Sequence, residues 1–322
     1  MKRALRYSPG AAGRSFSLAA ILLLSACGAP APSTNNGFTP PAALAGYTRY
    51  TLPVIEAIPP GSDILKCQWL AAPADHDQYI TVVGGAQSKG GHHIVLYSNK
   101  KIEDVGTTRD CTTDDMLNIG FLGAFGGEGN STGMGQIPDG VAFKLSKGQA
   151  LMANTHFLNA GTAQFNGEGV IDIKFVDRSE VKQLANLFAN LNLTFNVPQG
   201  TTGGADARCT FPQDVSFFRM ANHMHEWGKS IDSSVLRLNG QTEEVTRNDS
   251  WSREMTFNFP FTTWPLEKPM TIHKGDTLTT HCTWANTAAR DLRFPDEMCV
   301  VFGFYLATEG AQLTCQDGSW GG

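Results

Sequence analysis

The sequence has few charges and no cysteines at the spacing of a zinc or redox motif. Charged residues make up 17% of the 322 residues, below the roughly 25% of an average soluble domain. The net charge is −5 and there is no basic patch, so nothing predicts a nucleic-acid partner. None of the 7 cysteines belongs to a Cys-x-x-Cys pair, which argues against a cysteine zinc site or a dithiol redox motif.

A hydrophobic run long enough to span a bilayer is also missing. The N-terminal apolar run Leu18–Leu24 is too short for that, and basic residues precede it, as in a secretory signal: Lys2, Arg3, Arg6 and Arg14. Leu24-Ser-Ala-Cys27 resembles the bacterial lipobox, in which the cysteine is lipidated; plain cleavage nearby is the alternative. Gly28 follows instead of aspartate, which favours outer-membrane delivery. We therefore predict a signal peptide at 1–27 and an exported protein that touches the membrane only through a lipid on Cys27.

The remaining chain is long enough for two mid-sized domains. Residues 28–45 are rich in proline, alanine, serine and asparagine, the composition of a flexible tether. The predicted domains cover residues 46–182 and 183–322. An even number of cysteines in an exported chain predicts three disulfides without fixing their pairing: Cys67, Cys111, Cys209, Cys282, Cys299 and Cys315.

Alternation of polar and apolar residues dominates both predicted domains. Clear runs are Ala150–Phe157, Gly169–Val176 and Asp276–Trp284, and turn dipeptides such as Asn239-Gly240 separate the runs. Many short strands with frequent turns predict an all-β fold of two antiparallel, jelly-roll-like β-sandwiches in tandem.

One segment breaks this alternation. Asp177–Leu191 carries apolar residues at helical spacing, and we predict a helix there, at the junction of the two halves: Val181, Leu184, Leu187, Phe188 and Leu191. The alternative is a decorated loop within one larger sandwich.

Two histidines stand two residues apart beside a predicted strand. His223 and His225 follow the apolar run Val215–Ala221. Side chains at positions i and i+2 of a strand project from one face, so these imidazoles would lie side by side. Such a pair is half of a transition-metal site, although a pair of this kind can also be incidental.

A second candidate site begins at the adjacent pair His92-His93. Neighbouring residues of a regular strand point to opposite faces, so both can bind one ion only if the backbone bulges. Gly84-Gly85 and Gly90-Gly91 lie just upstream, and glycine permits such a distortion. The alternative is one core and one surface histidine.

Two single residues complete the candidate set. His156 lies in an alternating strand, and Met298 precedes the apolar strand Val300–Leu306. Each alone would be read as structural. Together with the histidine pairs they favour copper, because imidazole suits several metals while a thioether selects a soft ion such as Cu(I).

Four motifs in order resemble the copper type II, ascorbate-dependent monooxygenases. They are the paired histidines His92-His93, the strand Asn154–Phe157 with the third histidine, the run His223–Lys229, which fits His-x-His-x-x-Gly-Lys, and Asp296–Cys299, which reads Asp-Glu-Met-Cys. The resemblance covers nearly all of the chain after the signal.

The resemblance implies two copper ions, held by two sandwich domains across a solvent-filled cleft. His92, His93 and His156 would hold the copper that transfers an electron. His223, His225 and Met298 would hold the catalytic copper, which reacts with O₂, while ascorbate or another reductant supplies electrons. The disulfide pairings implied are Cys67–Cys111, Cys209–Cys315 and Cys282–Cys299.

The chain departs from the peptide-amidating members at substrate positions. Their arginine two residues before His-x-His is Ala221 here, and their asparagine and tyrosine after the methionine are Val300 and Phe302. A glutamine two residues before the third histidine is Asn154. We therefore expect hydroxylation of a small neutral or aromatic molecule rather than of a peptide that ends in glycine.

Two other readings remain open. A copper-binding lipoprotein that stores or delivers the ion would need only one exchangeable site. A three-histidine zinc hydrolase would need a nearby general base, and the sequence places no obvious carboxylate for it. The other histidines, His76, His273 and His281, are expected to be structural or on the surface.

Overall fold

The structure is a computed structural model that describes residues 37–43, 45–112, 114–115, 119–131, 137–256, 259–294, 296–308 and 312–321. The predicted signal peptide, the lipidation site Cys27 and the start of the tether lie outside these residues. Within the described ranges, no helix is both long and apolar enough to cross a membrane.

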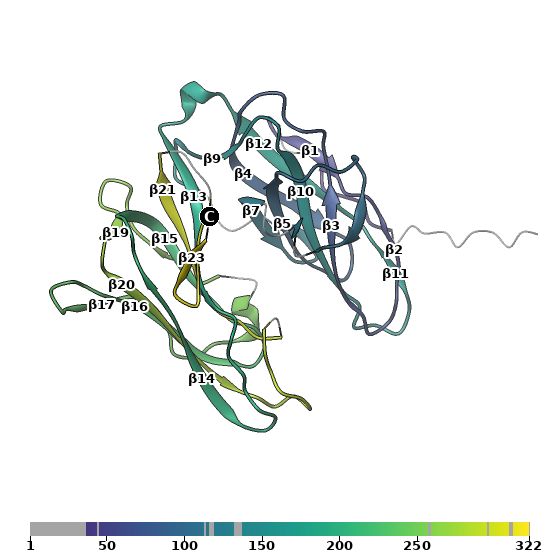
Figure 1. The fold of residues 1–322 in the computed structure, drawn as a ribbon. Helices are drawn as coiled ribbons and strands as arrows, with labels where there is room; N and C mark the ends of the chain where they lie inside the picture. Colours follow the sequence, from purple (N-terminus) through teal and green to yellow (C-terminus); the bar gives the residue numbers. More distant parts are fainter. Residues whose placement is uncertain are drawn as a thin grey trace, which may run out of the picture. The chain divides into compact units, whose positions relative to one another are not determined.

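The regular secondary structure of the described residues consists almost entirely of β-strands (Figure 1). Four strands of the first half form one layer, with β8 (Gly129–Ser131) paired to β4: β1 (Thr48–Thr51), β12 (Gly169–Val176), β4 (Gln78–Gln87) and β9 (Val141–Leu145). Five strands form the opposing layer: β6 (Thr108–Asp110), β3 (Asp63–Trp69), β10 (Ala150–Leu158), β5 (Gly91–Asn99) and β7 (Ile119–Gly126). A ribbon of β2 (Ile55–Ile58) and β11 (Phe165–Gly167) accompanies them.

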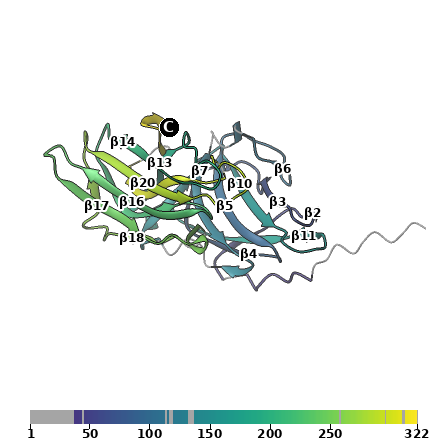
Figure 2. The same cartoon turned by 90° about the horizontal axis from the view of Figure 1, so that it is seen from below.

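The second half repeats this two-layer arrangement. One layer holds β13 (Gln183–Asn192), β21 (Cys299–Ala307), β15 (Val215–His223), β18 (Thr262–Thr263), β19 (Met270–Ile272), β22 (Leu313–Gln316) and β23 (Ser319–Gly321). The other layer, seen in Figure 2, holds β14 (Thr202–Thr210), β20 (Thr277–Ala285), β16 (Gly228–Leu236) and β17 (Thr242–Asn248). The all-β sandwich prediction is confirmed.

Each pair of layers encloses an apolar core. In the first half, Ile80 and Ile171 of one layer pack with Ile94 and Leu151 of the other. In the second half, buried side chains again come from both layers: Phe188, Phe217, Val235, Leu278 and Val301. Removing this apolar surface from water is the main force that holds the layers together.

The predicted helix at Asp177–Leu191 is wrong. A short 3₁₀ turn, η1 (Arg178–Glu180), is followed by strand β13. This strand is buried on both faces, since Leu184 and Phe188 pack in the second core while Leu187 packs in the first. A strand with two buried faces reads as an apolar run, which periodicity cannot distinguish from a helical stripe.

β13 also joins the two halves. Gln183 and Leu184 pair in parallel with Val141 and Ala142 of β9, so one layer of each half belongs to a continuous sheet. The ring of Phe304 on β21 lies 5.4 Å from that of Phe121 on β7. The first core therefore includes side chains from both halves of the chain.

All three disulfide pairings implied by the resemblance are confirmed. Cys67 on β3 bonds to Cys111. The other two bonds lie in the second half, one from β14 to β22 and one from β20 to β21: Cys209–Cys315 and Cys282–Cys299.

Candidate metal centres

A β-bulge brings His92 and His93 to one place. In the ladder between β5 and β10, His93 faces His156 and Gly91 faces Phe157. The register shifts at this point, so His92 is the extra residue of a bulge in this ladder. A bulge kinks the strand locally, which lets both neighbouring imidazoles turn toward His156.

The three imidazoles converge through their Nδ1 atoms. The Nδ1 atom of His156 lies 2.9 Å from that of His92 and 3.4 Å from that of His93. One nitrogen from each ring falls within 4.8 Å of the others. Among the described residues, this is the one group of three or more His, Cys, Asp or Glu side chains that converges in this way.

Burial keeps two of these rings uncharged at neutral pH. It lowers the pKa of His92 to about 4, and it lowers the pKa of the more deeply buried His93 well below its ordinary value. The positive charge of a protonated His156 would add to both effects. A metal ion binds the neutral imidazole, so this cluster, which we call the first centre, fits copper.

A carboxylate lies behind His156. The Nε2 atom of that ring is hydrogen-bonded to Asp63 on the neighbouring strand β3. A carboxylate accepts, so Nε2 carries the hydrogen and the Nδ1 lone pair is left facing His92 and His93. Sequence reasoning did not identify Asp63, because only the register of β3 against β10 reveals the contact.

His223 and His225 lie together at the end of β15. Their ring centroids are 5.1 Å apart and the ring planes are nearly perpendicular, at 86°. Nδ1 of His223 is buried and has no hydrogen-bond partner in the part of the chain that the structure describes. Burial also lowers the pKa of His223 well below its ordinary value. A neutral, buried imidazole with an unsatisfied nitrogen is what a metal ligand offers.

The ring of His225 is held by the segment just before β21, which also carries Met298. Its Nδ1 atom lies 3.1 Å from the carbonyl oxygen of Asp296. A carbonyl only accepts, so Nδ1 donates and the lone pair of Nε2 is left for a ligand bond.

The register of β15 against β21 directs Met298 toward His225. The ladder between β15 and β21 pairs Ala221 with Phe302 and His223 with Val300. The next pair on this face would be His225 with Met298, which is half-buried just before β21. We call the predicted set of His223, His225 and Met298 the second centre.

Glu297 connects the parts of the second centre. Its carboxylate has no exposed surface. Backbone N–H groups of His225, Trp227 and Met298 donate to it, as does the indole of Trp284. Burial raises the pKa of Glu297, and these N–H donors oppose that rise. Sequence reasoning quoted Glu297 only as part of a motif and gave it no role.

The three leftover histidines lie outside both centres. Each is exposed and contacts a nearby aspartate: His76 with Asp75, His273 with Asp214 and His281 with Asp206.

The second half of the chain matches a known family. Residues 199–319 match the family model for the "Copper type II ascorbate-dependent monooxygenase, C-terminal domain". These residues are thus similar to the C-terminal domain of the copper type II, ascorbate-dependent monooxygenases. The matched region contains His223, His225 and Met298.

Two curated relatives agree with this family. The chain is 20% identical over 297 residues to peptidyl-glycine alpha-amidating monooxygenase A of Xenopus laevis, which covers 87% of this chain and 31% of the relative. It is 21% identical over 299 residues to form B from the same organism, over 87% of this chain and 33% of that relative. The chain thus spans about a third of the length of each.

Solved structures give a weaker likeness. The glycosylasparaginase PNGase F from Flavobacterium meningosepticum superposes with a TM-score of 0.37 and 8% identity, over 82% of this chain and 97% of that one. A recombinant form of the same enzyme gives a TM-score of 0.36 and 8% identity, over 82% and 96% of the two chains. Neither value carries an argument about fold or function.

Aromatic rings border the second centre. The ring centroid of His223 lies 5.3 Å from that of Phe259 and 5.6 Å from that of Phe302. Phe261 continues the wall, since its ring lies 6.0 Å from that of Phe259. Beyond it, the guanidinium of Arg219 lies 4.9 Å from the centroid of Phe261.

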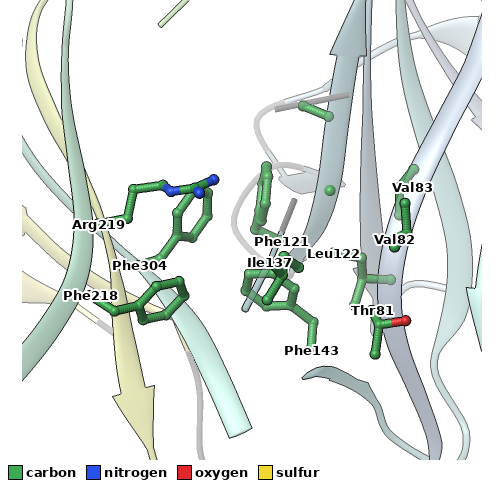
Figure 3. Close-up of a pocket in the computed structure, with 12 residues that line it drawn as sticks. Thr81, Val82, Val83, Phe121, Leu122, Ile137, Phe143, Phe218, Arg219 and Phe304 are labelled. Carbon is green, nitrogen blue, oxygen red and sulfur yellow. The ribbon is translucent and has the colours of Figure 1, made fainter. Parts of the chain in front are cut away.

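Arg219 is a cation that the motif comparison did not consider. It precedes Ala221 by two residues and faces Phe304, so it shares the strand face of Ala221 and His223. Figure 3 shows its guanidinium beside Phe304, at a gap that Phe121 also lines. The gap has a volume of about 30 Å³, room for about one water molecule. It is therefore too small to be a substrate pocket.

Proposed function

We propose that this chain is a copper-dependent monooxygenase that hydroxylates a C–H bond with O₂ and an external reductant such as ascorbate. The observation that carries the proposal is the pair of separate imidazole clusters on different sheets. In this proposal only the second cluster gains a thioether, from Met298 just before β21. Two sites of unequal ligand softness suit a reaction that divides electron supply and oxygen chemistry between two ions.

In this proposal, His92, His93 and His156 hold one copper, and His223, His225 and Met298 hold the other, catalytic one. Bound copper supplies the one-electron chemistry that couples O₂ reduction to C–H oxidation. The protein keeps the imidazoles of His92, His93 and His223 neutral by burial, so their lone pairs are available at neutral pH.

The substrate proposed is a small neutral or aromatic molecule. Phe259 and Phe302 border His223, and Ala221 presents no charge beside that ring. The nearest cation on this face, Arg219, is stacked on Phe261. Hydroxylation of a phenethylamine is expected to exceed that of a peptide ending in glycine. Faster turnover of the peptide would contradict this assignment.

The test of the function is reductant-dependent oxygen consumption by the copper-loaded protein, coupled to product detected by mass spectrometry. Copper binding without turnover across a broad set of C–H substrates would favour a copper-delivery protein instead.

Met298→Ala tests the second centre directly. Without the thioether, we expect the variant to keep the first copper and to lose hydroxylation, because the soft ligand favours Cu(I). Metal analysis and product formation measure the two effects. Two bound coppers and full turnover would show that Met298 is not a ligand.

We also propose that the chain is exported and anchored to the bacterial outer membrane by a lipid on Cys27. Support comes from the basic and apolar residues before Leu24-Ser-Ala-Cys27. Metabolic labelling with a radioactive fatty acid should mark the intact protein and fail in Cys27→Ser. Equal labelling of both would contradict the anchor.

A further inference from the structure

We infer that Glu297 is a positioning residue that holds His225 and Met298 in one geometry, so that the second centre assembles only when this carboxylate is present. The inference deepens the proposed function and rests on its assignment of His225 and Met298 as copper ligands.

The contacts of Glu297 reach both ligand-bearing segments. One carboxylate oxygen, Oε2, accepts the backbone N–H of His225 at 3.0 Å and that of Met298 at 3.2 Å. The same oxygen accepts the indole N–H of Trp284 at 2.9 Å. The other oxygen, Oε1, accepts the backbone N–H of Trp227 at 2.7 Å.

Two of these donors, the backbone N–H groups of His225 and Met298, lie just beyond the end of a ladder. The last pair in the ladder of β15 and β21 is His223 with Val300. Beyond that pair, the N–H groups of His225 and Met298 find their acceptor in one side chain instead of in a neighbouring strand. Buried N–H groups need acceptors, so the carboxylate replaces the missing end of the ladder.

The charge of Glu297 makes this arrangement specific. The carboxylate is fully buried, and within the described ranges no lysine or arginine forms an ion pair with it. A buried charge is tolerated only when hydrogen bonds replace its hydration. Its four donors must therefore stay in place, and two of them belong to the residues that offer Nε2 and sulfur to the ion.

The surroundings of Glu297 restrain His225 further. The indole of Trp251 donates to the carbonyl oxygen of His225 at 2.9 Å, and the hydroxyl of Thr256 donates to the carbonyl oxygen of Met224 at 2.9 Å. These bonds hold the histidine segment alone. Among the residues that the structure describes, Glu297 is the one whose side chain is hydrogen-bonded both to that segment and to the backbone of Met298.

Glu297→Gln in the full chain is the test, because glutamine keeps the shape but presents an NH₂ group to N–H donors. We expect the first centre to retain its copper while Cu(I) binding at the second weakens at least tenfold. Sulfur scattering in the Cu(I) X-ray absorption spectrum should disappear. At a copper concentration that just fills both centres of the unmodified protein, the variant should bind one ion per chain instead of two.

The matched control is Glu226→Gln. Glu226 follows His225 directly, is 53% exposed, and lies 4.0 Å from Arg253. The same change in side-chain chemistry at this exposed position should leave both coppers and the sulfur signal intact.

Several results would overturn the inference. One is a Glu297→Gln protein that binds two coppers with the sulfur signal unchanged. Another is a folded variant that loses copper equally from both centres, because a positioning role acts on one centre only. If the unmodified protein itself shows no Cu(I)–sulfur signal, the proposed copper assignment fails rather than the role of Glu297.

A second variant covers the case in which Glu297→Gln does not fold. Glu297→Asp keeps the charge but shortens the side chain, so it cannot reach all four donors at once. Circular dichroism checks its fold. We expect weaker Cu(I) binding at the second centre with an unchanged first centre, and affinity equal to that of the unmodified protein would overturn the inference.

Discussion

At the scale of single residues, the two centres differ in how much of each could be read from the sequence. The ligand candidates are recognisable by type and spacing, as in His223 and His225 at positions i and i+2. The carboxylates that orient them are not, because Asp63 and Glu297 reach their histidines across strands whose register the sequence does not reveal. Side chains that orient a candidate ligand without binding the ion are brought to it by tertiary structure alone.

Asp63→Asn should weaken the first centre. Asparagine can still accept from Nε2 of His156 but carries no charge, so the imidazole becomes a poorer donor to the ion. Because Asp63 is 67% exposed, we expect a loss of copper affinity of about tenfold, the lower end of the range for such partners. The reduction potential of the first copper should rise, as measured by redox titration.

Asp110→Asn is the control for that change. Asp110 is exposed on the same sheet and pairs with Lys66, remote from the histidine contacts. Equal copper affinities of the first centre in the Asp63 variant and the unmodified protein would show that Asp63 has no role at that centre.

At the scale of elements, irregularities at strand ends make both centres. The bulge in β5 was anticipated as the condition for His92 and His93 to share an ion, and the structure contains it. The strand β13 was not anticipated, because both of its faces are buried and its apolar residues follow no alternation. Periodicity detects a strand only when one face is solvated.

Gly228→Ala should disturb the turn that follows His225. A Cβ atom there would lie 2.6 Å from the ring of Trp251 and 2.3 Å from Cε of Met224. The methionine end can move, but Trp251 is held by its bond to the carbonyl oxygen of His225. Overpacking of this kind costs about 1–3 kcal/mol, and copper at the second centre should bind more weakly.

Thermal denaturation and copper titration measure these two effects. Gly321→Ala is the control, because a Cβ atom there meets nothing within 4 Å. Unchanged copper affinity of the second centre in Gly228→Ala would show that the ring of Trp251 can shift without moving His225.

At the scale of the whole molecule, the sequence predicted the number of sandwich layers but not how they are joined. The pairing of β9 with β13 links the halves, and no local pattern announces a parallel pair between distant strands. The histidine and methionine motifs are local in the sequence, so the sequence alone predicts them. The pairing of distant strands depends on the balance of all contacts, so the sequence alone does not predict it.

Acid should destabilise the fold through a buried carboxylate. Hydrogen bonds from Arg109 hold the pKa of Asp115 well below its usual range. Because the folded-state pKa is depressed, the stabilisation is complete above the unfolded value of about 4 and is lost as the pH falls below it. The melting temperature of the copper-free protein should therefore drop below about pH 4.

Asp115→Asn provides the comparison. At neutral pH the variant should have a lower melting temperature than the unmodified protein. Its melting temperature should fall less on acidification, as followed by circular dichroism from about pH 7 to pH 3. Parallel curves for the two proteins would show that other carboxylates govern the acid response.

The extra residue in β5 has one more consequence. The ladder with β10 pairs Gly91 and His93 with the adjacent residues Phe157 and His156, so excising His92 would make Gly91 and His93 adjacent as well. Deletion of His92 would therefore give a regular ladder that carries only two of the three imidazoles. A substitution of His92 would keep the bulge and remove only its imidazole. A cluster of three converging imidazoles and a regular sheet thus differ here by a single inserted residue.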